Sequence, residues 1–146
     1  MISRTIPGYI LAMAAAVNLA GAVKADGKQT SEQLCERGRI LFSEERYREA
    51  IPLLLRAGRM GDRDAQTLLG RAYRTGKGVR VDKRAAAYWF GQAAPRGDSF
   101  AMYALADMYE KGEGGLRQDP VEAERLRNQA RNNYGKKCCF LPNRPR

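Results

Sequence analysis

The chain has 146 residues, of which 26 are Lys or Arg and 16 are Asp or Glu, so its net charge is +10. Charged residues make up 29% of the chain and hydrophobic residues 44%, a balance that excludes both a disordered chain and a membrane protein with many spans. The sequence contains no histidine. This absence excludes histidine-based acid–base catalysis, Ser-His and Cys-His nucleophile pairs, and zinc sites with a histidine ligand.

The N-terminus has the three-part pattern of a secretory signal peptide. Arg4 supplies the positive start, residues 9–17 (YILAMAAAV) form an unbroken apolar run, and small residues follow up to Ala25. The apolar run is shorter than the roughly 20 residues that a membrane-spanning helix needs. We therefore expect cleavage between Ala25 and Asp26, with cleavage after Ala22 as the alternative, and a mature protein that is periplasmic or secreted.

The rest of the chain repeats itself at an interval of 36 residues. The segment from Gly61 to Ala65 (GDRDA) matches the segment from Gly97 to Ala101 (GDSFA). The same interval relates Leu69 to Leu105, Gly70 to Ala106, Tyr73 to Tyr109 and Gly76 to Gly112. Self-similarity at this interval predicts a solenoid of stacked units.

Each unit is predicted to form two helices. In the central copy, the first helix spans residues 64–75 and is ended by Gly76. The second helix begins after Asp82, its predicted N-cap, and is ended by Pro95 and Gly97. Its apolar stripe consists of Ala85, Ala86, Trp89, Phe90 and Ala93. We expect this stripe to be part of the core and not a cofactor site.

Between Asp64 and Ala94 the central copy reads DAQTLLGRAYRTGKGVRVDKRAAAYWFGQAA. This stretch resembles the Sel1-like repeat, which is related to the tetratricopeptide repeat, through Leu-Gly-x-x-Tyr, Gly-x-Gly-Val and Lys-x-Ala, with Phe90 where the family usually has Tyr. Residues 100–131 are similar to a second, weaker copy, and residues 34–57 are similar to a shorter tetratricopeptide unit. The resemblance implies an all-α fold, a short right-handed solenoid of about three antiparallel helix pairs.

These assignments divide the chain into four parts. They are a signal peptide over residues 1–25, a linker over 26–30, the repeat domain over 31–134 and a basic tail with cysteines over 135–146. In the last helix of the repeat domain, Arg125, Leu126 and Arg127 stand where the central copy has Tyr88, Trp89 and Phe90. We expect this helix to be the solvated end cap that a solenoid requires.

The resemblance also implies where a partner would bind, because stacked helix pairs of this type present the first helix of each pair on a concave face. The candidate protein-binding residues at outward positions of these helices are Arg39, Phe42, Arg71, Arg74, Tyr103, Asp107 and Glu110, with Ser43 and Thr67 beside them. The arginines would form a basic half of the groove, and the residues of the third helix an acidic half. The alternative is that these charges are ordinary solvated surface.

Three cysteines in an exported chain are expected to oxidise. Cys35 lies in the first predicted helix, and Cys138 and Cys139 lie in the tail. A bridge from Cys35 to either tail cysteine, a vicinal bridge within the tail and an intermolecular bridge all remain open. The first is geometrically tight, because the chain from Tyr134 to Cys138 extends at most ~14 Å.

Little in the sequence supports catalysis or a cofactor. No serine of the mature chain begins a Ser-x-x-Lys motif, the glycine-rich segments coincide with turns between helices, and three cysteines without histidine are a poor metal site. Nucleic acid is an unfavourable partner, because the chain is exported and its arginines alternate with glutamates. The positive charge fits an acidic protein partner, an anionic envelope surface, or a basic surface with no specific role.

The function that fits these observations best is a periplasmic protein-binding adaptor or regulator that performs no chemistry and binds an envelope component or an effector. An immunity protein that neutralises a toxic effector and a structural accessory of an envelope machine are the alternatives.

Overall fold

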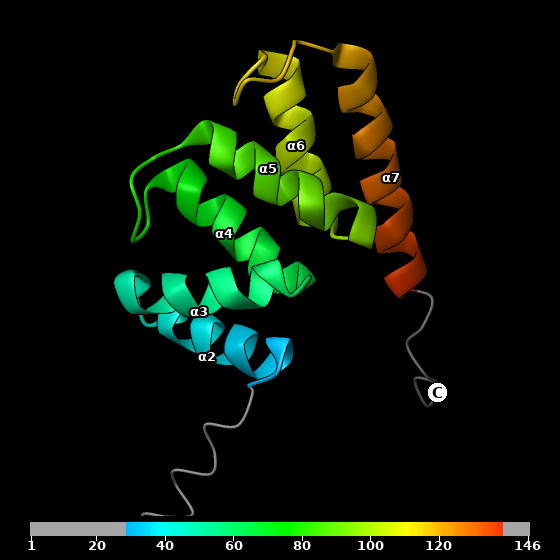
Figure 1. Ribbon diagram of the computed structural model, residues 1–146. Coiled ribbons are helices and arrows are strands. Elements are labelled where there is room, and N and C mark those ends of the chain that lie inside the picture. Colours follow the sequence, from blue (N-terminus) through cyan, green and yellow to red (C-terminus); the bar gives the residue numbers. More distant parts are fainter. Residues whose placement is uncertain (1–28, 139–146) are drawn as a thin grey trace, which may run out of the picture.

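The computed structural model of the chain describes residues 29–138, with the side chains of residues 29–134. Within this range there are six α-helices, one short 3-10 helix and no strand. They are α2 (Ser31–Ser43), α3 (Tyr47–Arg59), α4 (Arg63–Thr75), α5 (Lys83–Ala93), the 3-10 helix η2 (Ala94–Arg96), α6 (Ser99–Lys111) and α7 (Pro120–Cys138) (Figure 1). None of the helices in this part of the chain is long and apolar enough to cross a membrane.

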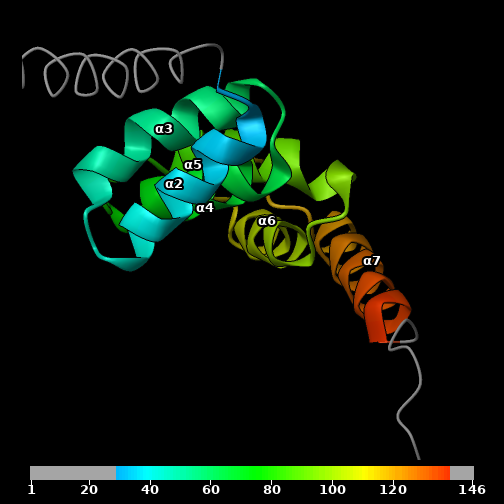
Figure 2. The same cartoon turned by 90° about the horizontal axis from the view of Figure 1, so that it is seen from below.

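The helices form three antiparallel pairs, α2–α3, α4–α5 and α6–α7, which are stacked in chain order (Figure 1). The first helices of the pairs also pack on one another, α2 on α4 and α4 on α6, and they follow one another in Figure 2. Each second helix also packs on the first helix of the next pair, α3 on α4 and α5 on α6. We call the exposed surface of this row, with the adjoining side of α7, the inner face. The predicted all-α solenoid is confirmed.

The repeat of the sequence reappears in the way the helices begin. Asp62 and Asp98, which lie 36 residues apart, cap α4 and α6 by accepting hydrogen bonds from backbone N–H groups three residues later, at 2.8 and 2.7 Å. Asp82 is the N-cap of α5, as predicted, and Asp119 accepts the corresponding bonds at the start of α7. Such caps satisfy N–H groups that a helix leaves unpaired in its first turn.

The loop inside each repeat packs closely against the preceding helix pair. A Cβ atom on Gly78 would lie 2.7 Å from the backbone of Tyr47 at the start of α3, and one on Gly114 would lie 2.5 Å from the carbonyl oxygen of Lys83 at the start of α5. Both glycines also have a positive φ, 74° and 69°. Glycine is therefore required twice over at this position, by the close approach and by the backbone conformation.

The apolar stripe of α5 is buried, as predicted, and it connects two cores. Trp89 packs in a core with residues of α2, α3 and α4, whereas Phe90 packs in a second core with residues of α6 and α7. The two neighbouring side chains thus point toward opposite ends of the solenoid. Helix α5 therefore contributes to both cores, one shared with the first helix pair and the other with the last helix pair.

The last helix differs from the sequence-based expectation in its length. Helix α7 continues to Cys138, four residues beyond the expected end at residue 134. Gly135 is a helix-ending signal in the sequence, but the next proline is Pro142, and the helix continues past the glycine. Ala123, Leu126 and Ala130 of α7 are buried against α6.

Candidate functional site

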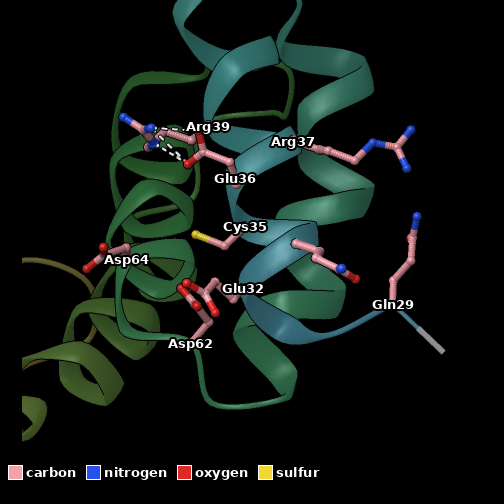
Figure 3. Close-up of a pocket in the computed structure, with 9 residues that line it drawn as sticks. Gln29, Glu32, Cys35, Glu36, Arg37, Arg39, Asp62 and Asp64 are labelled. Carbon is pink, nitrogen blue, oxygen red and sulfur yellow. Dashed lines mark hydrogen bonds and ion pairs between the residues drawn. The ribbon is translucent and has the colours of Figure 1, made fainter.

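The larger of the two hollows that form the candidate site on the inner face lies between α2 and the start of α4 and has a volume of about 720 Å³. Figure 3 shows that several acidic side chains gather there around a thiol. These residues, which we call the acidic pocket, are Glu32, Cys35, Glu36, Asp62 and Asp64. Arg39 and Arg37 also line this hollow; the guanidinium of Arg39 is bound to Glu36 at 2.8 Å, and the side chain of Arg37 extends away from the acidic residues (Figure 3).

Among the described residues Cys35 of the acidic pocket has no disulfide partner, and only 6% of its surface is exposed. Burial, then a hydrogen bond to Asp62 and the negative charges of Asp62 and Asp64, raise the pKa of the thiol to about 12. The thiolate is the reactive form of cysteine, so Cys35 is protonated and unreactive at neutral pH.

The structure does not decide the predicted disulfides. Cys139 and the side chain of Cys138 lie outside the described residues. Helix α2, which carries Cys35, packs on α3 and α4, whereas α7 packs on α6 at the other end of the stack. All the bridges considered above therefore remain predictions.

The second hollow, of about 310 Å³, lies where α4, α6 and α7 meet on the inner face. It is lined by Arg74, Phe100, Tyr103, Ala104, Asp107 and Arg127. Arg71 adjoins it, because its guanidinium carbon lies 5.3 Å from the centre of the Phe100 ring. We call these seven residues, with Tyr134 described below, the arginine–aromatic hollow.

The two arginines of α4 in this hollow have no ionic partner. The guanidinium of Arg71 stacks over Phe100, and that of Arg74 lies 6.0 Å from the centre of the Phe90 ring. Neither guanidinium forms an ion pair or a hydrogen bond with any residue that the structure describes. Their hydrogen-bond donors therefore remain available, while the rings restrict their positions.

Three aromatic side chains are exposed side by side here. Phe100 is 42% exposed, Tyr103 is 38% exposed, and Tyr134 of α7 is 53% exposed. The rings of Tyr103 and Tyr134 lie 6.5 Å apart, and Tyr134 shares a small adjoining hollow with Phe100. Clustered exposed aromatic residues beside arginine are typical of protein interfaces.

The acidic residues predicted on α6 are already neutralised by partners. Asp107 is bound to Lys111 at 3.1 Å, and Glu110 is bound to Arg127 of α7, a contact that raises the pKa of Arg127. Arg127 was expected on the solvated end cap, but its side chain reaches back to the inner face. The helical spacing of the sequence could not show this, because it does not give the rotation of α7 relative to α6.

The predicted separation into a basic half and an acidic half is not seen, because Arg74 and Asp107 line the same hollow. The first hollow is acidic, since Asp62, the N-cap of α4, lies beside Glu32 and Cys35 of α2 (Figure 3), and Asp64, which is paired with Arg63 at 3.0 Å, also lines it. The second hollow holds Arg74, with Arg71 beside it, and neither guanidinium is paired with an acid among the described residues.

The predicted binding residues fall into three groups. Arg74, Tyr103 and Asp107 line one hollow together with Arg71 beside them, and Glu110 contacts it through Arg127. Arg39 lies apart from them, at the acidic pocket. The prediction for Phe42 was wrong as a surface position, because Phe42 is 8% exposed and packs edge-on against Tyr47 in the core. Of the two residues beside them, Thr67 is also buried and donates a hydrogen bond to a backbone carbonyl, whereas Ser43 is exposed.

Sequence reasoning missed Phe100, Arg127 and Tyr134 as members of the site. One signal was present for Phe100, which stands where the preceding repeat has Asp64. An exposed aromatic residue, at a position of the first turn where the preceding repeat has an acid, indicates a surface that binds a partner. Among the described residues, no group of three or more potential metal ligands is arranged to hold an ion.

A family model for the Sel1 repeat matches residues 63–98 and residues 99–133. Residues 63–133 belong to the Sel1 repeat family. The two matches begin at the first residues of α4 and α6, so each Sel1 repeat is one helix pair. Sel1 repeats are generally protein-interaction modules and are typically non-catalytic. The pair α2–α3 precedes the matched residues.

Solved structures of Sel1 proteins are similar to this chain. A Sel1 repeat protein from Oxalobacter formigenes is 30% identical, with a TM-score of 0.63, and the match covers 67% of this chain and 40% of that protein. A protective antigen present in uropathogenic Escherichia coli strains, which displays an SLR fold, is 29% identical, with a TM-score of 0.62, and the match covers 78% of this chain and 27% of that protein. The chain thus spans less than half the length of either protein. None of the curated proteins compared with the chain matches it.

Proposed function

We propose that this protein is a binding module that holds a segment of another protein on the inner face of its Sel1 solenoid, and that it performs no chemistry. It would act as an adaptor or regulator in the periplasm, after removal of the N-terminal signal peptide. The observation that carries the proposal is the arginine–aromatic hollow, where exposed rings and guanidinium groups without ionic partners lie together on the row of first helices.

Two features of this hollow support protein binding. Tyr, Phe and Arg are enriched at interfaces, because rigid rings bury much surface for little loss of conformational freedom and a guanidinium offers several hydrogen-bond donors in a planar arrangement. The residues come from three helices that the two cores hold in place, so the surface is formed before a partner arrives. Such preorganisation lowers the entropic cost of binding.

Site-specific photo-crosslinking tests this function. A photoreactive phenylalanine analogue replaces Tyr103 on the inner face or, as the matched control, Tyr88, which is exposed on the outward side of α5. In an envelope extract of the source cells, we expect a defined cross-linked protein from position 103 and none from position 88. Equal cross-linking at both positions, or none at position 103, would contradict the proposal. The identity of the captured protein then separates an adaptor from an immunity protein.

A further inference from the structure

We infer that the arginine–aromatic hollow recognises an extended acidic segment of the partner protein, one that also carries an apolar or aromatic side chain. This inference rests on the proposed function and adds the chemistry of the segment. It comes from two observations in the hollow: guanidinium groups that lack an anion, and exposed rings that lack a covering.

The missing anion is apparent from the ion pairs around Arg71 and Arg74. The nearby carboxylates of α6 are already bound, Asp107 to Lys111 and Glu110 to Arg127. Among the described residues, no carboxylate is paired with either arginine of α4. A guanidinium that stacks on a ring keeps its edge free, and that edge fits a carboxylate with two parallel hydrogen bonds.

The rings provide the second half of the recognition. Phe100, Tyr103 and Tyr134 form a continuous apolar strip beside the arginines. A side chain of the partner that lies on this strip would bury the faces of the rings, which is the main source of affinity in most interfaces. We expect the segment to be extended, because the arginines and the rings belong to three helices, α4, α6 and α7, and not to one deep cavity.

Other anionic partners fit this face less well. A nucleic acid carries negative charge along its whole length, and the acidic pocket with Glu32, Asp62 and Asp64 lies on the same face. A bilayer is flat on this scale, whereas the hollow is recessed where α4, α6 and α7 meet. A protein segment can place its acidic residues at one end only, and therefore avoids both conflicts.

Selection from a random peptide library tests the chemistry directly. The library is displayed on phage and selected on the mature wild-type protein, with no selection against the arginine variants. We expect the retained peptides to be enriched in Asp or Glu together with Phe, Tyr, Trp or Leu. Retained peptides that are basic or uncharged would overturn the inference.

A retained peptide then serves as the probe for affinity measurements by fluorescence anisotropy. We expect the double variant to bind it at least about ten-fold more weakly than the wild type, because two attractive charges become repulsive. The matched control is Arg48→Glu with Arg56→Glu on α3, which makes the same charge change at exposed positions away from the inner face. The affinity of this control variant for the peptide should change by less than about two-fold, because salt screens charges that lie far from the bound peptide. Both variants should keep the wild-type melting temperature.

A conservative variant separates geometry from charge. Arg71→Lys with Arg74→Lys keeps the positive charge but loses the planar fork and the stacking, so we expect binding to weaken about three- to ten-fold. Unchanged affinity in this variant would show that only the positive charge of the side chains matters, and it would contradict bidentate recognition.

The outcomes distinguish the inference from the proposed function. Peptides that bind the Arg→Glu double variant as well as the wild type overturn the inference, while cross-linking at position 103 would still support the proposed function. Phosphatidylglycerol vesicles or a single-stranded DNA oligonucleotide that bind with the same dependence on Arg71 and Arg74 also overturn it, because they would identify another class of ligand. A library from which no peptide is retained contradicts both.

Discussion

At the scale of single residues, the packing is best seen in the glycines of the helices. Gly70 of α4 faces the ring of Phe90, and a Cβ atom added there would lie 2.6 Å from two ring carbons. Gly91 of α5 has no atom within 4 Å of the same added group. Only Gly70 is therefore required for the close approach of α4 and α5, and Gly91 is not.

Alanine at these two positions should change stability in opposite directions. We expect Gly70→Ala to lower the free energy of unfolding by ~1–3 kcal/mol, because the methyl group overpacks the core against Phe90. Gly91→Ala should raise it by ~0.5–1 kcal/mol, because alanine favours the helix and meets no obstacle. Chemical denaturation measures both, and a stabilising Gly70→Ala would refute the close contact.

The buried thiol of Cys35 predicts a pH dependence of stability. The pKa of the thiol is about 12 in the folded protein, against an ordinary value of 9.0 that we take for the unfolded chain. Above pH 9 the unfolded chain releases this proton and the folded protein retains it, so the free energy of unfolding falls by up to about 1.4 kcal/mol per pH unit. Below pH 9 the full contribution of the buried thiol to the free energy of unfolding is present.

Reduced wild-type protein and Cys35→Ala, unfolded in denaturant between about pH 8 and pH 10.5, provide the measurement. The wild type should lose stability more steeply than the variant above pH 9, because tyrosines and lysines titrate alike in both. Parallel curves would mean that Cys35 is accessible to solvent.

At the scale of elements, α5 is the junction of the molecule. Its adjacent Trp89 and Phe90 belong to the two different cores. Truncation of either should destabilise the protein, but each should loosen a different end of the solenoid. Both effects originate in α5, because Trp89 and Phe90 lie in the same turn of this helix and pack against different helix pairs.

We expect Trp89→Ala to cost ~3–5 kcal/mol as a large buried truncation. Hydrogen exchange should then quicken mainly in α2 and α3, whereas Phe90→Ala should quicken it mainly in α6 and α7. A cooperative melt of Trp89→Ala that shifts by only a degree or two would contradict the burial of this side chain.

The helices could be predicted from the sequence more fully than the site. Gly76 and Asp82 mark the end of α4 and the start of α5 by local chemistry, and the structure reproduces both. Which side of α2 or α7 faces the groove depends on packing between helices, and spacing alone does not contain it. Phe42 was therefore placed on the surface, and Arg127 was placed on the end cap.

At the scale of the whole molecule, export and oxidation remain predictions. The intact mass of the protein from a periplasmic extract, measured without reduction, should correspond to a chain that begins at Asp26. It should also lack two hydrogens for one disulfide that includes Cys138 or Cys139. A full-length chain with three free thiols would contradict both expectations.

The whole molecule presents one face with an acidic end and an arginine–aromatic end, on a row of helices fixed by two cores. This polarity would allow a partner segment to bind in one direction only, and it would make association faster at low salt. The central claim is that the partner lies on this face.

Hydrogen–deuterium exchange of the mature protein, with and without the partner captured by cross-linking, tests this claim most directly. We predict that binding slows exchange in the last turn of α4 and in α6, around Arg74 and Tyr103, and leaves α3 and the exposed side of α5 unchanged. Protection confined to α3 and α5, with none in α4 and α6, would show that the partner binds the outer face and would contradict the account.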